Sequence, residues 1–391
     1  MSTLVSFDSS RPEHERFAET SGLKWCKFLE RTSEVVTKST HQSAKPVSIE
    51  ISELYIFLNT INMAGDLVLL TGSTGHIGYR TLIEALSQGY HVRAAVRSEA
   101  KAADVKAAKS TQPYLNQLTF VTVPNIEKEG AFDSAVKGVD HIVHLASPLA
   151  EPTDDNEANI IQPAIRGTLS ILYSALKEPS IKKVVITSSV AAVSPSEAKT
   201  FTADNVEPDP QGPFDNTFAA YSASKKLAYN RTRDFIAREK PNFDIINIMP
   251  TFVIGKNELA TTREAVNAGS NSLAMVPILG MQNPGGTPAF TCHVDDVAFV
   301  HIASLKSEIK GNQNFGVNYV GQAPVEWDDA VDIVKQHFPK EVEQGIFPLG
   351  GSSKSIAMAF DASKTEEVFG IRFKSFEDQI VSLAGYYAEL A

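Results

Sequence analysis

Short apolar runs alternate with amphipathic segments along most of the chain after Asp66. Residues 67–71 are apolar up to Thr71, which is typical of a strand buried on both faces of a sheet. Apolar positions about one helical turn apart predict a helix from Ile77 to Gly89. Further strands are expected at 91–96, 118–123, 141–145, 184–187 and 244–249, and further helices at 156–177 and 219–238. This alternation predicts an α/β fold, a doubly wound parallel sheet with helices on both faces.

The pattern changes at both ends of the chain. Beyond Pro250, frequent Gly and Pro separate helices expected at 294–305, 327–337 and 376–387, which predicts a smaller α+β lobe. Residues 1–62 show no strand–turn–helix alternation, and we interpret them as a loosely ordered extension. Translated sequence upstream of a start at Met63 would belong to the same interpretation, and a targeting arm is the alternative. We therefore expect an extension at 1–62, a first domain at 63–250 and a lobe at 251–391, with part of 290–320 returning to the first domain.

Composition narrows the classes of function. The chain has 36 Lys and Arg against 46 Asp and Glu, a net charge of −10, and its basic residues form no run, so a nucleic-acid partner is not expected. The longest apolar stretches are too short to span a membrane. Two cysteines, Cys26 and Cys292, cannot form a disulfide framework, and this usage fits a reducing cytosol. We predict a cytoplasmic protein that is a monomer or a weak homodimer.

A glycine turn lies between the first strand and the first helix. Gly72 permits the tight turn, Gly75 lets the backbone approach a pyrophosphate, and Gly78 allows close packing of the helix on the strand. The helix N-terminus offers free N–H groups to the phosphates. The turn at this junction therefore predicts a Rossmann-type dinucleotide site, with the cofactor contacted by Gly72, Thr74, Gly75, His76, Ile77 and Gly78.

The tip of the second strand indicates which dinucleotide binds. An acidic residue there would hold the ribose 2′-hydroxyl of NAD, but Val96 occupies that position. Arg97 follows directly and Lys101 lies four residues later, while Glu99 is expected to point away on the turn. Two cations suit a 2′-phosphate, so we predict NADPH or NADP⁺ as the cofactor. Two solvated surface cations with no such role are the alternative.

A tyrosine and a lysine lie one turn apart near the start of the helix at 219–238. Their spacing, Tyr221 and Lys225, puts both side chains on one face of the helix. An ammonium close to a phenol favours the phenolate, so such a tyrosine can exchange a proton near neutral pH. Ser188 and Ser189 follow the fifth strand, where ligands bind in open α/β sheets, and a hydroxyl there could bond a substrate carbonyl or merely form a turn.

Several segments give the chain after Met63 a family resemblance. The glycine turn, the run from Thr187 to Val193 and the segment from Ala220 to Lys226 resemble the extended branch of the short-chain dehydrogenase/reductase superfamily. Within that branch the chain is similar to dihydroflavonol reductases and to fungal-type NADPH-dependent methylglyoxal, aldehyde and ketone reductases. The resemblance implies Ser189, Tyr221 and Lys225 as catalytic residues and Leu149, Val190 and Phe252 as walls of the substrate pocket. It also implies cofactor contacts at Asn125, Ile126, Ala146, Tyr221, Lys225, Pro250 and Val253.

The expected function is that of a carbonyl reductase, which uses hydride from NADPH to reduce a small-molecule aldehyde or ketone to an alcohol. One alternative is a nucleotide-sugar epimerase or dehydratase with NAD, against which Arg97 argues. The other is a non-catalytic NADP-sensing regulator, a class that lacks the tyrosine–lysine pair. His293 with Asp295 and Asp296 is expected to cap a helix, so no metal site is predicted. His144 and Cys292 are expected to be buried core residues.

Overall fold

The computed structural model describes residues 65–147, 152–197 and 200–390. The predicted extension at 1–62 and the predicted pocket residue Leu149 lie outside these ranges. Within them, no helix combines the length and the apolar character needed to cross a membrane.

A parallel sheet of seven strands forms the centre of the described structure, in the order β11-β7-β5-β4-β1-β2-β3. Its apolar strands are the ones that the sequence predicts, with the addition of β11 at one edge. The predicted doubly wound α/β fold is thereby confirmed. The strands are β1 (Leu67–Thr71), β2 (His91–Val96), β3 (Leu118–Thr122), β4 (His141–His144), β5 (Lys183–Thr187), β7 (Asp244–Pro250) and β11 (Gln313–Val317).

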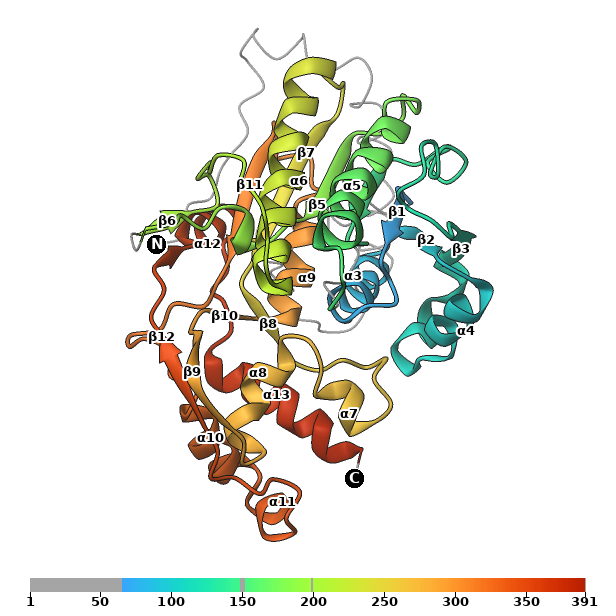
Figure 1. Ribbon diagram of the computed structural model, residues 1–391. Helices are drawn as coiled ribbons and strands as arrows, with labels where there is room; N and C mark the ends of the chain where they lie inside the picture. The colour runs from blue at the N-terminus through green and yellow to red at the C-terminus, as the bar shows by residue number, and fades with distance from the viewer. Residues whose placement is uncertain (1–64, 148–151, 198–199, 391) are drawn as a thin grey trace, which may run out of the picture. The chain divides into compact units, whose positions relative to one another are not determined.

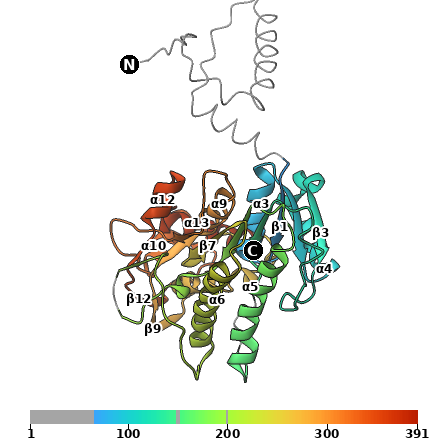
Figure 2. The same ribbon diagram turned by 90° about the horizontal axis from the view of Figure 1, so that it is seen from above.

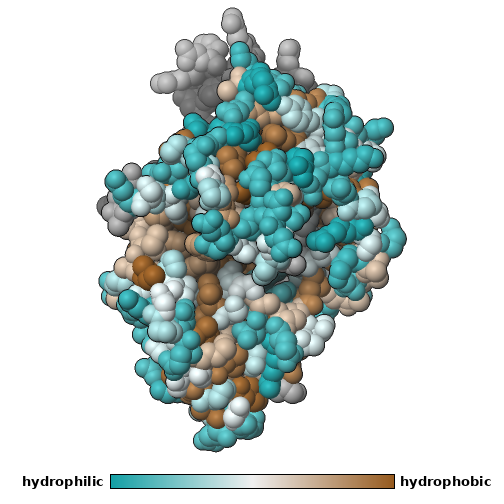
Figure 3. Space-filling model, in the orientation of Figure 1, coloured by the Kyte–Doolittle hydropathy of each residue, from teal (hydrophilic) through white to brown (hydrophobic). Residues whose placement is uncertain are grey.

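Helices cover both faces of this sheet, as Figures 1 and 2 show. On one face α3 (His76–Ser87) packs against α9 (Val294–Ala303), and on the other α5 (Gln162–Ala175) packs against α6 (Thr217–Glu239). The alternation along β1 explains the two layers. Leu69 is buried in the cluster under α5 and α6, whereas Val68 and Leu70 are buried with the residues of α3 and α9. The outer surface seen in Figure 3 is mostly polar.

The helix predicted at 156–177 has a different start in the structure. A wide π turn, η3 (Glu157–Ile161), precedes α5. Pro163 in the first turn of α5 has no N–H to donate to the residue four positions earlier, which interrupts the helical ladder at this point. Short elements complete this half of the chain: α4 (Glu99–Ala107), η2 (Lys109–Gln117), η4 (Val190–Ala192) and β6 (Phe201–Thr202).

Beyond β7 the chain builds a lobe around its own apolar cluster, which includes the fully buried Trp327 and Phe347. Two small parallel sheets, β10 with β8 and β12 with β9, lie here. The chain also returns to the main sheet through α9 and β11. The domain boundary predicted at residue 250 stays a prediction. The remaining elements are β8 (Phe252–Ile254), α7 (Arg263–Val266), α8 (Asn271–Ile278), β9 (Gln282–Pro288), β10 (Thr291–His293), α10 (Asp329–His337), α11 (Pro339–Glu343), β12 (Ser352–Ile356), β13 (Phe360–Asp361), α12 (Ser363–Phe369) and α13 (Phe376–Glu389).

Candidate active site

Two glycines of the turn after β1 are required by the fold itself. Gly72 has a φ of 79°, and a Cβ on it would lie 2.8 Å from the backbone nitrogen of Ala146. A Cβ on Gly78 would lie 1.9 Å from the carbonyl oxygen of Gly72. A side chain on Gly72 would therefore push the turn away from the segment after β4, and a side chain on Gly78 would push α3 away from the end of β1.

The middle glycine, Gly75, has a different reason to be a glycine. Its φ of −97° suits any residue, and a Cβ there would meet only the carbonyl oxygen of Gly72, at an ordinary contact distance of 3.5 Å. Gly75 is exposed and begins α3, and among the described residues no side chain caps this helix and no acid lies in its first turn. A bare helix N-terminus without a Cβ in front of it fits the phosphates of a dinucleotide. Thr74, His76 and Ile77 flank this cradle.

His76 connects the turn to the loop that follows β8. Its Nε2 lies 3.2 Å from the carbonyl oxygen of Lys256, and because a carbonyl only accepts, Nε2 carries the proton. Burial lowers the pKa of His76 to about 4, so the ring is neutral at physiological pH. The glycine turn is thereby attached to the lobe by a neutral hydrogen bond.

The two cations near the tip of β2, Arg97 and Lys101, differ in whether they are paired with another side chain. Arg97 is exposed and has no hydrogen-bond or ion-pair partner in the part of the chain that the structure describes. Glu99 accepts a hydrogen bond from Thr122 Oγ1 at 2.8 Å, so its carboxylate is held at the end of β3. Lys101 pairs with Asp104 at 2.9 Å on the surface of α4. Of the two predicted phosphate ligands, Arg97 is the one that is available without breaking another contact.

The helix α6 brings Tyr221 and Lys225 together near its start. Asn216 caps this helix by accepting a hydrogen bond from Ala219 N at 2.9 Å, which fixes the first turn. The Lys225 Nζ lies 5.5 Å from the centre of the Tyr221 ring and donates to Ser147 Oγ at 3.2 Å. Ser147 is a partner that the sequence analysis missed, although it directly follows Ala146, one of the cofactor contacts that the resemblance implies.

Ser189 lies just beyond the end of β5. It is buried and begins the short helix η4, where its Oγ accepts a hydrogen bond from Ala191 N at 3.2 Å. η4 packs against α6, so the serine and the tyrosine–lysine pair belong to neighbouring elements at the carboxyl end of the sheet. The hydroxyl proton of Ser189 remains available for a ligand.

The other residues predicted to contact the substrate or the cofactor differ in how far they are buried. Val190 is buried, and the Phe252 ring packs 5.4 Å from the Phe290 ring and 6.3 Å from the Trp327 ring. Asn125 is exposed and accepts from Glu127 N at 2.8 Å. Ala146 donates its backbone N–H to Thr71 Oγ1, and the Ile126 side chain lies against Gly167. Pro250 and Val253 are buried at the junction of β7 and β8.

The polar cluster at the start of α9 is a helix cap and an ion-pair network. His293 Nδ1 accepts a hydrogen bond from Asp295 N at 3.0 Å. Asp295 pairs with Arg80 of α3 at 2.6 Å and with Lys374 at 2.5 Å, which holds its pKa at about 2 despite its burial. In the described ranges, no group of three or more His, Cys, Asp or Glu residues is arranged to hold a metal ion.

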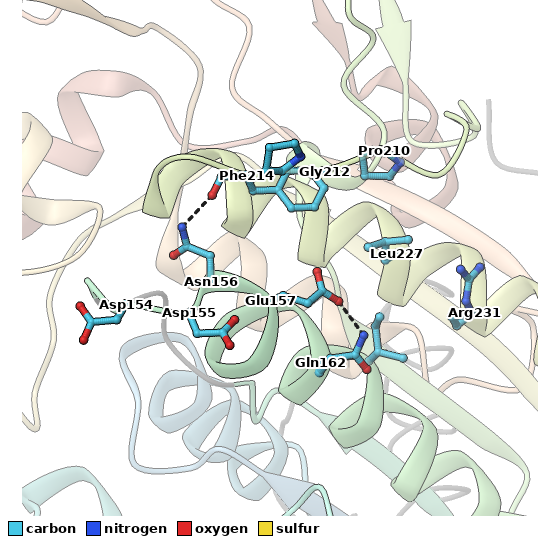
Figure 4. A pocket seen from close by; sticks show the side chains of 12 residues that line it. Asp154, Asp155, Asn156, Glu157, Gln162, Pro210, Gly212, Phe214, Leu227 and Arg231 are labelled. Carbon is cyan, nitrogen blue, oxygen red and sulfur yellow. Dashed lines mark hydrogen bonds between the residues drawn. The ribbon is translucent and has the colours of Figure 1, made fainter.

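A pocket with a volume of about 590 Å³ opens between the start of α5 and α6 (Figure 4). Its acidic side chains come from Asp154, Asp155 and Glu157, and its apolar wall from Phe214, Leu227 and neighbours. Asn156 donates to the Phe214 carbonyl at 2.8 Å, and Glu157 accepts from Gln162 at 2.7 Å. Ser189, Tyr221 and Lys225 do not line this pocket.

Comparison with known proteins assigns the family. The NAD dependent epimerase/dehydratase family matches residues 68–317, more than half of the chain. The chain belongs to this family, which contains the branch that the sequence resembles.

Individual relatives cover nearly the whole described structure. The ketoreductase CTB6 of Cercospora beticola is 37% identical over 345 residues, 84% of this chain and 96% of the relative. The putative NADPH-dependent methylglyoxal reductase GRP2 of Candida albicans is 31% identical over 348 residues, 81% of this chain and 98% of the relative. The crystal structure of Gre2 from Candida albicans with NADPH matches with a TM-score of 0.72 and 25% identity, over 83% of this chain and 99% of that structure.

Proposed function

We propose that the protein is an NADPH-dependent carbonyl reductase that works through Ser189, Tyr221 and Lys225. The observation that carries the proposal is the pairing of Tyr221 with a fixed Lys225 at the carboxyl end of a sheet whose first turn forms an open dinucleotide cradle. Relatives named as ketoreductases and as an NADPH-dependent reductase support the same class. The protein is an oxidoreductase that acts on a small molecule.

Three groups of side chains and backbone atoms support the choice of NADPH as the cofactor. The N-terminus of α3 and Gly75 would hold the pyrophosphate, and the free Arg97 would hold the 2′-phosphate. Lys225, with one N–H donated to Ser147, keeps further N–H groups for the nicotinamide ribose. When bound, NADPH supplies the hydride that reduces the substrate carbonyl carbon.

The side chains of this chain handle the charge and the proton. Negative charge develops on the carbonyl oxygen as its carbon is reduced, and Ser189 Oγ–H is available to donate a hydrogen bond to that oxygen. Tyr221 gives its phenolic proton to the same oxygen, which yields the alcohol. The Lys225 ammonium, held 5.5 Å from the ring centre, stabilises the phenolate that remains. Val190 and Phe252 offer the apolar wall on the substrate side.

An epimerase with NAD is the second function in this family. It would need an acid at the tip of β2 to hold the 2′-hydroxyl of NAD. There Glu99 accepts a hydrogen bond from Thr122, and Arg97 has no partner within the described part of the chain. This arrangement favours a 2′-phosphate and therefore the reductase.

The test is NADPH oxidation by the purified protein with a panel of aldehydes, ketones and α-diketones, compared with Tyr221→Phe. The substitution keeps the ring and its packing but removes the proton donor, so we expect kcat to fall by about 10²–10⁴-fold. NADPH binding, titrated by fluorescence, should persist in the same variant. Near-normal turnover by Tyr221→Phe with intact NADPH binding would remove Tyr221 from the mechanism, whereas a wild-type protein that binds NADPH but reduces none of the compounds would favour the regulator.

A further inference from the structure

His144 lies at the end of β4 with its ring almost fully buried, and its hydrogen bonds define its tautomer. Its Nδ1 lies 2.9 Å from Thr71 Oγ1. That hydroxyl oxygen already accepts two backbone hydrogen bonds, from Leu145 N at 3.1 Å and from Ala146 N at 3.0 Å. A hydroxyl has two acceptor positions and one proton, so Thr71 donates its proton to Nδ1 of His144.

The proton of the His144 ring is therefore on Nε2. Burial, with a smaller contribution from the charge of Lys225, lowers the pKa of His144 to about 3, so the ring is neutral at the working pH. Nε2–H is a buried donor that meets no acceptor among the described residues. Buried donors in native proteins are almost always satisfied, by protein or by ordered water.

A small cavity of about 20 Å³ lies beside this ring, and a cavity of that size holds one water molecule. Lys225 lines it from the side of α6, with N–H groups left after its bond to Ser147. Thr187 lines it from β5 and offers an acceptor. The proton of Thr187 Oγ1 goes to His301 Nε2 at 2.7 Å, because His301 Nδ1–H donates to the Val297 carbonyl at 2.7 Å.

The cavity is thus lined by two residues with uncommitted donors, His144 and Lys225, and by an acceptor on Thr187, and it has room for one water. We propose that His144 is a positioning residue, which through Nε2–H holds a buried water that also accepts a hydrogen bond from Lys225 Nζ and donates one to Thr187 Oγ1. The water anchors the ammonium, so that Lys225 keeps its place during turnover. This inference rests on the proposed role of Lys225 in the reductase. The titratable groups that line the cavity are His144, Lys225 and Tyr229.

Two matched substitutions separate this role from a purely structural one. His144→Gln carries an amide N–H near the position of Nε2 and loses the acceptor for Thr71. His144→Asn keeps a polar atom near Nδ1 for Thr71 and loses the donor to the cavity. We expect kcat at saturating NADPH to stay within about threefold of wild type in the Gln variant and to fall about 10-fold in the Asn variant, the loss of one hydrogen bond to a charged network.

A crystal structure of the wild-type NADPH complex gives the second readout. A water within about 3.2 Å of both His144 Nε2 and Lys225 Nζ supports the proposal. A dry cavity, or a Gln variant that loses as much kcat as the Asn variant, overturns it. Failure of the proposed function is recognised separately, because the wild-type protein would then reduce no carbonyl compound while the water remains observable.

Discussion

At the scale of single residues, the tip of β2 makes the cofactor preference testable. Arg97 has no hydrogen-bond or ion-pair partner among the residues that the structure describes, whereas Lys101 is paired with Asp104. Replacing Arg97 by Ala removes a charge-assisted contact to the 2′-phosphate, so kcat/KM with NADPH should fall about 10- to 100-fold while turnover with NADH changes little. Lys101→Ala is the matched control, with a smaller expected loss. Steady-state kinetics with both cofactors measure this, and an equal loss with NADPH and NADH would indicate a folding role for Arg97.

The glycine turn permits a second test at this scale. Gly75→Ala should leave the melting temperature without cofactor nearly unchanged, because the added Cβ meets nothing closer than 3.5 Å. NADPH affinity should fall at least about 10-fold, because the methyl group lies where the phosphates approach. Thermal unfolding and fluorescence titration measure the two effects.

Gly78→Ala is the contrasting substitution. Its Cβ would lie 1.9 Å from a backbone oxygen, so the protein itself should be strongly destabilised before any cofactor is added. If Gly75→Ala destabilised the protein as much as Gly78→Ala, the cradle at Gly75 would be structural as well.

At the scale of elements, Asp295 joins three parts of the chain: α9, α3 through Arg80, and the segment before α13 through Lys374. These cations hold its pKa at about 2, below the ordinary value of 3.8. A depressed pKa in the folded state gives stability that is present above pH 4 and is lost as the pH falls towards 2. Asp295→Asn should lower the free energy of unfolding by about 1–2 kcal/mol at pH 7, with a smaller difference at pH 3.

Denaturant unfolding at both pH values measures this difference. Asp104→Asn is a suitable control, since Asp104 forms only an exposed pair with Lys101 and its loss should change stability little. A pH-independent loss in Asp295→Asn would mean that packing, rather than charge, stabilises this junction.

The sequence predicted the elements well where the pattern was strong. The sheet could be predicted because strands buried on both of its faces appear in the sequence as continuous apolar runs. The proximity of Tyr221 and Lys225 could be predicted because residues four apart lie on the same face of a helix. Ser147 and Thr71 escaped prediction because their roles depend on contacts with residues distant in sequence, Lys225 of α6 for Ser147 and the end of β4 for Thr71. The availability of Arg97 over Lys101 likewise depends on Asp104, a surface contact that no periodicity reveals.

At the scale of the whole molecule, the extension before Met63 is predicted to be dispensable. The seven-stranded sheet and both of its helix layers are formed by residues from Leu67 onward. A chain that begins at Met63 should therefore fold and keep its kcat/KM within about twofold, a change of less than about 0.5 kcal/mol. Circular dichroism and the NADPH assay measure this, and insolubility or loss of most of the activity would show that residues 1–62 are needed.

The position of β11 has a consequence for synthesis on the ribosome. This edge strand pairs with β7, yet the two are separated along the chain by β8, α7, α8, β9, β10 and α9. A nascent chain that has just completed β7 can pair one edge of this strand with β5, but the other edge of Asp244–Pro250 stays unpaired until residues 313–317 have been translated and have left the exit tunnel. Bare strand edges are templates for intermolecular pairing. Premature termination between these two strands would therefore release chains prone to aggregate through β7.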